Sequence, residues 1–442
     1  MRSRIALILC AIFFLSACKR NPVGPPVTPN VQLSADYVTC TEVWLKIGFA
    51  DSPGGGDYKI TRDGSTVLTG TINGASTVVY DTTAQAKKSY TYAAYKLASG
   101  QVKEISPPLS VTTLDSTSHD FTWQTFNFGG DAGSCLLRDV TIINDTMVYA
   151  VGEVYLKDSI WQTTYSPNNL LTWDGKSWTT SRIYFYAACG PSPMVSYPTY
   201  GILPLSSKDI WIAGGGEITR WNGNSQSDPV CVESPMSFGI NKIYGRDTNS
   251  VYAVGDVGNI AQYDGRAWRS ISSGTSLAIQ DVWGTVDAET GQSKVLAIAC
   301  NRFTIDGIAV LQLSGNTVSN VQTRGLPPTV SSVWSANGKE WYVCGDALCK
   351  TKSLNAPWQG VTGIPPNFKE CIRGNGPNDI FVVGDYGLVS HFNGSTWHTY
   401  PALQGELIYY GLAMKEDLIV AVGGITTGGV GGAATILMGR RN

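Results

Sequence analysis

The feature that most constrains this sequence is an internal repeat, because units of about 20–50 residues that recur along a chain decide its architecture. The clearest copy runs from Ile240 to Ile271 and reads INKIYG, NSVYAVGDVG, NIAQYDG and RAWRSI. A second copy starts at Glu370 with ECIRG, NDIFVVGDYG, LVSHFNG and STWHTY. Gly255 and Gly384 hold the same place in the two copies and lie three periods of about 43 residues apart. Each copy therefore predicts four short strands.

The number of copies follows from the glycine-containing end of the second strand. This dipeptide recurs at Val151-Gly152, Ala213-Gly214, Val254-Gly255, Ala299-Cys300, Cys344-Gly345, Val383-Gly384 and Val422-Gly423. A four-stranded unit of this period is typical of propeller blades. We therefore expect residues 119–442 to form a seven-bladed β-propeller.

The two ends of the repeat region predict how the ring closes. The last copy reaches Asn442 before any fourth strand, whereas the segment from His119 to Phe126 resembles an isolated fourth strand with its tryptophan, Trp123. Because closure of a ring removes exposed strand edges, we expect this N-terminal strand to pair with the last copy.

The connections between third and fourth strands carry a recurring turn sequence. It occurs at Asp174-Gly175, Asn222-Gly223, Asp264-Gly265 and Asn393-Gly394. These dipeptides predict type I′ hairpins, and we expect Trp178, Trp268 and Trp397, which follow three of them, to pack between neighbouring blades. The pattern resembles bacterial propellers with Asp-box-like turns, although the full Asp-box pattern of sialidases is absent.

Residues 31–115 form a different region, in which short alternating segments and turn signals predict an all-β sandwich. The segments are Val43 to Phe49, Tyr58 to Arg62, Val78 to Tyr80, Tyr90 to Tyr95 and Leu109 to Thr113. Their order, with YKITRDG at one turn and Tyr90-x-Tyr92 near a corner, resembles a fibronectin type III domain. That resemblance implies an Ig-like spacer or adhesion module and no chemistry.

The first residues predict export. Arg2 and Arg4 precede an apolar run that ends at Leu15, which is the layout of a secretory signal and is too short to span a bilayer. Leu15-Ser16-Ala17-Cys18 resembles the bacterial lipobox. The resemblance implies that residues 1–17 are a signal peptide and that Cys18 carries the lipid anchor, palmitate included. The alternative is an ordinary signal peptide with an incidental cysteine.

The residues after Cys18 extend this prediction. Residues 18–30 contain four prolines and no apolar periodicity, so they read as an extended tether. Lys19 in place of aspartate implies an outer-membrane lipoprotein of a Gram-negative cell. The protein is expected to be extracytoplasmic and membrane-anchored.

Cysteine usage agrees with export, because eight cysteines remain beyond Cys18 and an even number suits an oxidising compartment. They are Cys40, Cys135, Cys189, Cys231, Cys300, Cys344, Cys349 and Cys371. Cys344 and Cys349 could bridge a hairpin, and Cys189 could pair with Cys135 or Cys231. The spacing does not fix the connectivity.

Composition excludes some classes of function. The net charge is -2, whereas nucleic-acid binding needs clustered Lys and Arg, so no nucleic-acid partner is expected. The three histidines, His119, His391 and His398, show no metal-ligand spacing. We expect no metal site, no cofactor and no catalytic residue from the sequence.

The candidate binding residues lie in two insertions of the first copy, Glu153 to Pro167 and Tyr184 to Tyr200. Both fall on connections of the face that propellers usually use for binding, and loop aromatics stack on sugars or anchor proteins. The aromatic candidates are Tyr155, Trp161, Tyr165, Tyr184, Tyr186 and Tyr197. The alternative is that these aromatics cover their own loops as a small satellite core.

A second candidate is a ring of acidic residues after the repeated glycine, namely Glu153, Asp256, Asp346 and Asp385. Such a ring could bind a cation or supply an acid and a base. The alternative is that each acid caps its own turn, since residues repeated in every unit usually serve the unit.

Three functions remain open, the last of which is an assembly role in the outer membrane. The anchor, the modular order and the missing catalytic signature favour a surface lipoprotein whose propeller binds a protein or a glycan. A carbohydrate-active enzyme, a hydrolase or lyase, is the alternative, because propellers host such chemistry and fold alone does not decide function.

Overall fold

The computed structural model describes residues 30–130, 134–157, 167–232, 239–287, 291–302, 304–425 and 432–442. In these ranges the regular structure is almost entirely β, with two short 3-10 helices, η1 (Asp256–Gly258) and η2 (Pro401–Leu403). No helix within them combines the length and the apolar character that crossing a membrane requires. Cys18, the predicted anchor, lies outside the described residues.

The chain divides into two compact units. The smaller one contains Trp44–Asp81 and Tyr90–Val111, and the larger one contains Thr112–Asn442. The strands of the N-terminal region are β1 (Val31–Val38), β2 (Val43–Phe49), β3 (Gly55–Arg62), β4 (Ser65–Asn73), β5 (Ser76–Asp81), β6 (Ser89–Ala98), β7 (Gln101–Ile105) and β8 (Leu109–Thr112).

These eight strands form two sheets, one ordered β1-β2-β5 and the other β4-β3-β6-β7 with β8 on β6. Trp44, Ile60 and Tyr92 are buried in this region, as the alternation of apolar residues predicts. The Tyr92 hydroxyl donates to the buried Asp81 carboxylate over 2.8 Å, and Arg62 donates to the same oxygen over 2.9 Å. The phenol is thereby satisfied inside the core.

The larger unit contains seven four-stranded antiparallel sheets among its described residues. In order they are β10 (Leu136–Asn144), β11 (Met147–Val154), β12 (Asn168–Trp173) and β13 (Trp178–Ser181); β16 (Gly201–Ser206), β17 (Asp209–Gly214), β18 (Glu217–Trp221) and β19 (Val230–Cys231); β20 (Ile240–Asp247), β21 (Ser250–Gly255), β22 (Ile260–Tyr263) and β23 (Trp268–Ile271); β24 (Ile279–Val286), β25 (Ser293–Cys300), β26 (Ile308–Ser314) and β27 (Thr317–Val321); β28 (Val330–Trp334), β29 (Trp341–Gly345), β30 (Cys349–Thr351) and β31 (Gln359–Gly360); β32 (Lys369–Gly376), β33 (Asp379–Gly384), β34 (Val389–Phe392) and β35 (Trp397–Thr399); β36 (Leu407–Lys415), β37 (Leu418–Ile425), β38 (Ala434–Arg441) and β9 (Phe121–Phe128).

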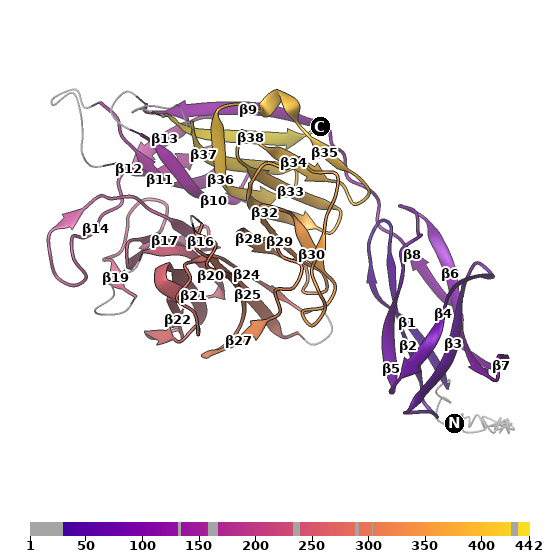
Figure 1. Ribbon diagram of the computed structural model, residues 1–442. Coiled ribbons are helices and arrows are strands. Elements are labelled where there is room, and N and C mark those ends of the chain that lie inside the picture. The colour runs from indigo at the N-terminus through magenta and orange to yellow at the C-terminus, as the bar shows by residue number, and fades with distance from the viewer. Residues whose placement is uncertain are drawn as a thin grey trace, which may run out of the picture. The chain divides into compact units, whose positions relative to one another are not determined.

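The first strands of these sheets are neighbours in a closed cycle, from β10 through β16, β20, β24, β28, β32 and β36 back to β10. They gather around a common centre in Figure 1. The last sheet takes its fourth strand from the N-terminal side, because β9 pairs with β38 from Phe121↔Arg441 to Phe128↔Ala434. The isolated strand therefore lies where the sequence predicts it.

Tryptophans that follow the repeated turns pack between neighbouring sheets, as predicted. Trp178 lies 6.5 Å from Phe126 of β9 by ring centroids, and Trp268 lies 6.0 Å from Trp211 of the preceding sheet. The turns themselves differ from the predicted type I′, because Gly175 has a positive φ but Asp174 does not. Instead Asp174 Oδ1 accepts from the N–H groups of Lys176 and Ser177, which closes a four-residue loop.

Candidate functional site

The first strands of the seven sheets surround the common centre, and we call them the inner strands. Six of the seven carry a β-bulge near their first residues. In each, one residue has no partner in the register with the second strand, and all six such residues are polar: Arg138, Asn241, Gln280, Ser331, Glu370 and Tyr410. Bulges re-aim side chains and are frequent beside functional sites. We call this set of six residues the bulge ring. It lies at one end of the central channel between the inner strands, namely the end at which the second strands finish.

The predicted acidic residues lie at this same end and contact the inner strands. Arg138 donates to Glu153 over 3.1 Å, and Asn241 donates to Asp256 over 3.2 Å. Thr329 donates to Asp346. These contacts are different from the turn capping considered as an alternative, because the carboxylates accept from side chains at the start of the inner strands.

The four carboxylates do not converge on one point. Among the described residues, the one group of three or more metal-ligating side chains with neighbouring ligand atoms is Cys189, Glu217 and Cys231. The acidic residues therefore do not form a common cation site there, because each is held within its own part of the ring.

Asp385 differs from the other three acids. Its Oδ1 atom is buried and accepts no hydrogen bond from the described part of the chain, and burial raises the pKa of its carboxyl group. Glu370 lies nearby, paired with Arg302, and burial raises its pKa against the pull of that arginine. The mouth of the channel thus holds two carboxyl groups whose charged forms are disfavoured.

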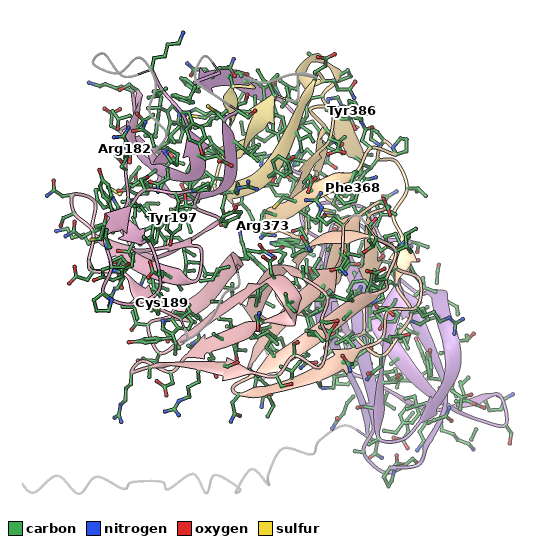
Figure 2. The ribbon with its side chains drawn as sticks, turned by 60° about the vertical axis from the view of Figure 1, so that its left-hand side comes forward. Arg182, Cys189, Tyr197, Phe368, Arg373 and Tyr386 are labelled. Atoms are coloured by element: carbon green, nitrogen blue, oxygen red, sulfur yellow. A yellow bond between two sulfur atoms is a disulfide. The ribbon has the colours of Figure 1, made fainter. Side chains whose placement is uncertain are left out.

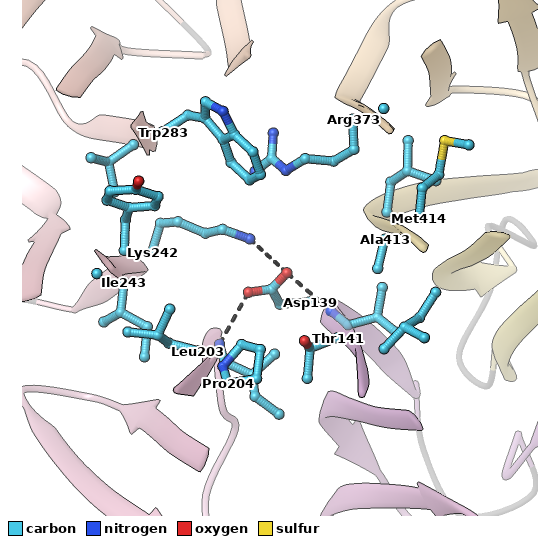
Figure 3. A pocket seen from close by; sticks show the side chains of 18 residues that line it. Asp139, Thr141, Leu203, Pro204, Lys242, Ile243, Trp283, Arg373, Ala413 and Met414 are labelled. Atoms are coloured by element: carbon cyan, nitrogen blue, oxygen red, sulfur yellow. Dashed lines mark hydrogen bonds and ion pairs between the residues drawn. The ribbon is translucent and has the colours of Figure 1, made fainter. Parts of the chain in front are cut away.

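Beyond the bulge ring the channel contains a cavity of about 280 Å³. Asp139 and Lys242 meet in it over 2.6 Å, and Arg373 stacks over Trp283 at 4.7 Å (Figure 3). The remaining wall includes Leu203, Pro204, Ala413 and Met414. Asp139 and Lys242 are paired with each other and Arg373 is paired with the buried Asp281, so these charges chiefly support the ring.

Polar residues also join neighbouring inner strands. Asp139 Oδ2 accepts from the N–H of Ile202 on the next inner strand, and Asp281 Oδ2 accepts from the N–H of Val333, each over 3.0 Å. Arg373 donates to both oxygens of Asp281 over 3.1 and 3.0 Å. Burial by itself would raise the pKa of Asp281, but Arg373 and Lys242 hold it below the ordinary value.

The predicted aromatic residues divide into three groups. Trp161 and Tyr165 lie outside the described residues. Tyr155 donates to Glu153, and Tyr197 stacks on the fully buried Phe185 at 5.0 Å and donates to the Gly214 carbonyl, so both serve their own loops. Tyr184 is exposed and Tyr186 is half-buried. The labelled Tyr197 and Cys189 lie away from Arg373 of the channel wall (Figure 2).

The second insertion is held by a small sheet of β14 (Phe185–Tyr186) and β15 (Met194–Val195) and by a disulfide between Cys189 and Cys231. This is one of the two pairings considered for Cys189. Cys344 and Cys349 are free and buried, so the predicted hairpin bridge between them is wrong. The reason is register: Cys349 pairs with Val343, and consecutive residues such as Val343 and Cys344 point to opposite faces.

We expect the double variant Cys189→Ala/Cys231→Ala to lose about 2–4 kcal/mol of unfolding free energy, because the bridge closes a loop between residues 42 apart. Urea unfolding followed by tryptophan fluorescence measures the change. Reductant should produce the same loss in the wild type and none in the variant. Equal stability of variant and wild type would show that the bridge constrains little.

Three turns at the mouth present exposed apolar side chains that sequence reasoning missed. Val257, Ile305 and Tyr386 are 66%, 81% and 67% exposed, and each follows a second strand. Val257 and Tyr386 both have φ of 57°, which holds them in equivalent left-handed turns. The signal was available in the repeat, because Asp256-Val257-Gly258 and Asp385-Tyr386-Gly387 align.

Comparisons with known proteins bear on the fold. No family model matches the sequence, and no curated protein matches it. Among solved structures, the chain is similar to one titled "YCF48 bound to D1 peptide", with 11% sequence identity and a TM-score of 0.52 over 72% of this chain and 95% of that one. At this level of identity the likeness shows the fold alone: the chain contains a β-propeller.

Proposed function

We propose that this chain is an extracytoplasmic lipoprotein, anchored through Cys18, whose fibronectin-like domain is a spacer and whose seven-bladed propeller binds a segment of a partner protein at the channel mouth. The observation that carries the binding site is the combination of exposed Val257, Ile305 and Tyr386 with the bulge ring at one end of the channel. Exposed apolar residues beside polar, shaped surface are typical of protein interfaces.

The seven sheets and their cyclic neighbours support seven blades, with β9 completing the last one. The lipobox-like Leu15-Ser16-Ala17-Cys18 supports the anchor. A propeller of similar fold is described as bound to a D1 peptide, which supports a protein segment as the class of ligand. A glycan is the other ligand class that loop aromatics favour.

The test compares variants at the two ends of the channel. Peptides are selected from a random phage-displayed library on the mature wild-type chain, and their affinities are measured by fluorescence polarisation. We expect Val257→Ser/Tyr386→Ser to weaken binding by about tenfold or more, because apolar anchors at an interface each contribute about 1–2 kcal/mol.

Val286→Ser is the matched control, since Val286 is also exposed but ends the inner strand β24 at the opposite end of the channel. It should leave the affinity unchanged. Selected peptides that bind the double variant as tightly as the wild type would remove the mouth as the binding site. Enrichment of glycans on an array, with no peptide enriched, would replace the protein partner by a glycan.

A further inference from the structure

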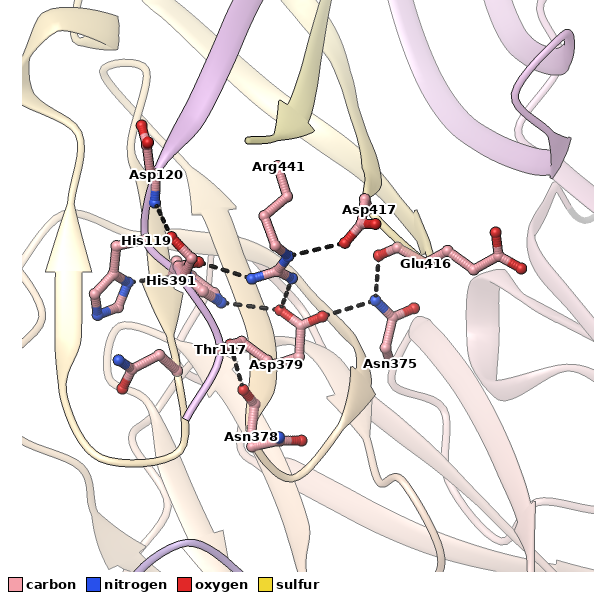
Figure 4. A network of polar contacts seen from close by, with 12 residues as sticks. Thr117, His119, Asp120, Asn375, Asn378, Asp379, His391, Glu416, Asp417 and Arg441 are labelled. Carbon is pink, nitrogen blue, oxygen red and sulfur yellow. Dashed lines mark hydrogen bonds and ion pairs between the residues drawn. The ribbon is translucent and has the colours of Figure 1, made fainter. Parts of the chain in front are cut away.

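The buried carboxylates of this protein have cation partners, with one exception. Eight aspartate and glutamate side chains are buried in the described part of the chain. Seven of them form ion pairs: Asp81 with Arg62, Asp139 with Lys242, Asp281 with Arg373, Asp287 with Lys294, Glu340 with Lys350, Glu370 with Arg302 and Asp379 with Arg441. Figure 4 shows the last of these pairs, in which Asp379 Oδ1 also lies 2.9 Å from His391 Nε2. The exception is Glu217.

Glu217 is 3% exposed, and no cation from the described ranges contributes to its surroundings. It begins β18 and lies opposite Cys231 of β19 in the register. Its Oε2 accepts the N–H of Tyr186 over 2.9 Å, and the Tyr197 hydroxyl lies 3.5 Å from the same oxygen. Oε1 contacts one polar atom of the described residues, Cys231 Sγ, at 3.6 Å. A buried carboxyl group without a cation is costly in its charged form, and this one lies against a disulfide.

The two sulfurs of that disulfide differ in access. Cys189 is exposed in the connection between β14 and β15, whereas Cys231 is half-buried. A thiolate that attacks a disulfide bonds to the accessible sulfur and displaces the other one, and the rate depends on how readily that other sulfur leaves. A neighbouring acid that supplies a proton assists such a departure. Burial raises the pKa of Glu217, so its carboxyl group keeps a proton to higher pH than an exposed glutamate does.

We propose that the Cys189–Cys231 bridge is a site of thiol–disulfide exchange with an external dithiol, in which Glu217 donates a proton to the departing Cys231 sulfur. A thiolate of the dithiol attacks Cys189 Sγ, the bond between the two cysteines breaks, and its electron pair leaves on Cys231 Sγ. Glu217 protonates that sulfur through Oε1. The second thiolate of the dithiol then displaces Cys189 and closes a disulfide within the reagent, which has lost two electrons. Solvent returns the two protons that the reagent released, one to Cys189 and one to Glu217.

The same contact suits the reduced state. The thiol of Cys231 then donates to Oε1 of the ionised Glu217, so the carboxylate gains a partner that it lacks while the bridge is intact. The insertion keeps other contacts, because Tyr184 N–H donates to Gln226 Oε1 over 2.9 Å and Gln226 Nε2 donates to the Tyr184 carbonyl over 2.8 Å. Exchange therefore releases the connection between β14 and β15 from β19 and leaves the pairing of β18 with β19 in place.

The test measures how fast dithiothreitol reduces the bridge of the mature full-length chain between pH 5 and pH 8.5. Acid quenching, labelling with N-ethylmaleimide and mass spectrometry count the thiols of Cys189 and Cys231. Dividing the wild-type rate by that of Glu217→Gln cancels the titration of the reagent, and glutamine still accepts from Tyr186. We expect a ratio of about ten at pH 5. It should fall to about one or below as the pH passes the raised pKa of Glu217, because an ionised carboxylate has no proton to give.

Asp228→Asn is the matched control, since Asp228 is an exposed acid three residues before Cys231. It should be reduced at the wild-type rate at every pH. A second measurement needs no variant: brief treatment of the wild type with glutathione should place the mixed disulfide on Cys189. Three results would overturn the proposal, namely equal rates for wild type and Glu217→Gln at every pH, a ratio that does not change with pH, or glutathione on Cys231.

Discussion

Asp281→Ala is expected to lower the free energy of unfolding by about 3–5 kcal/mol, the usual cost of leaving a buried charge without its partner. Asp281 and Arg373 have side chains only 5% and 7% exposed. Without the carboxylate, the guanidinium keeps the Ser332 hydroxyl and the Ile372 carbonyl as close partners. The N–H of Val333 on the next inner strand also loses its acceptor. Urea unfolding of the mature chain measures the loss.

Two further variants separate this effect from a general loss of charge. Asp145→Ala removes an exposed partner of Arg440, 3.6 Å away, and should cost at most about 1 kcal/mol. Asp281→Ala/Arg373→Met removes both buried charges and should be more stable than Asp281→Ala alone. If the two single aspartate variants lose equal stability, the buried pair does not hold the ring together.

Cys18→Ser is expected to move the protein from the membrane fraction to the soluble fraction almost completely. Each buried CH₂ of an acyl chain contributes about 0.8 kcal/mol, and stable anchoring takes more than one chain. Fractionation of the cells that express the protein, with immunoblotting and labelling by a palmitate analogue, measures the change.

Cys10→Ser provides the matched control, because Cys10 lies in the apolar run that precedes Cys18 and has no place in the lipobox-like tetrapeptide. It should leave the protein in the membrane fraction and labelled. Retention of Cys18→Ser in the membrane fraction would mean that another part of the chain attaches the protein, and the lipoprotein proposal would fail.

The repeat predicted the sheets of the larger unit well because its information is local. All seven dipeptides used for counting lie at the second strand of a four-stranded sheet. Apart from the pairing of β9 with β38, the hydrogen bonds of these sheets join strands that are consecutive in the sequence. Trp123 identified β9, because it is a fourth-strand tryptophan that precedes the first complete copy of the repeat. Its strand was therefore expected to complete the last copy, which lacks a fourth strand. The turn type was wrong, since Asp174 caps a four-residue loop from its side chain, which the dipeptide alone does not distinguish from a two-residue hairpin.

The candidate site was only partly accessible from the sequence. The acidic positions, among them Glu153 and Asp256, were found because they follow a repeated glycine, and they do lie at the channel mouth. Their partners were missed, as were Lys242 and Arg373 of the channel wall. Alternation along a strand assigns faces only while the register is regular, and the extra residue at Arg138 or Glu370 shifts that assignment at the point where the channel begins.

The sequence by itself determined the repeated four-stranded unit and the closing strand, because each is written in contiguous residues. Tertiary structure alone decided which polar residues face the channel, that Cys189 joins Cys231 and that His119 meets His391 across 272 residues. The physical reason is that closing the ring brings together groups whose separation along the chain carries no periodic signal. Their contacts depend on bulges and on the seam between the first and last strands, which exist only once all the sheets are in place.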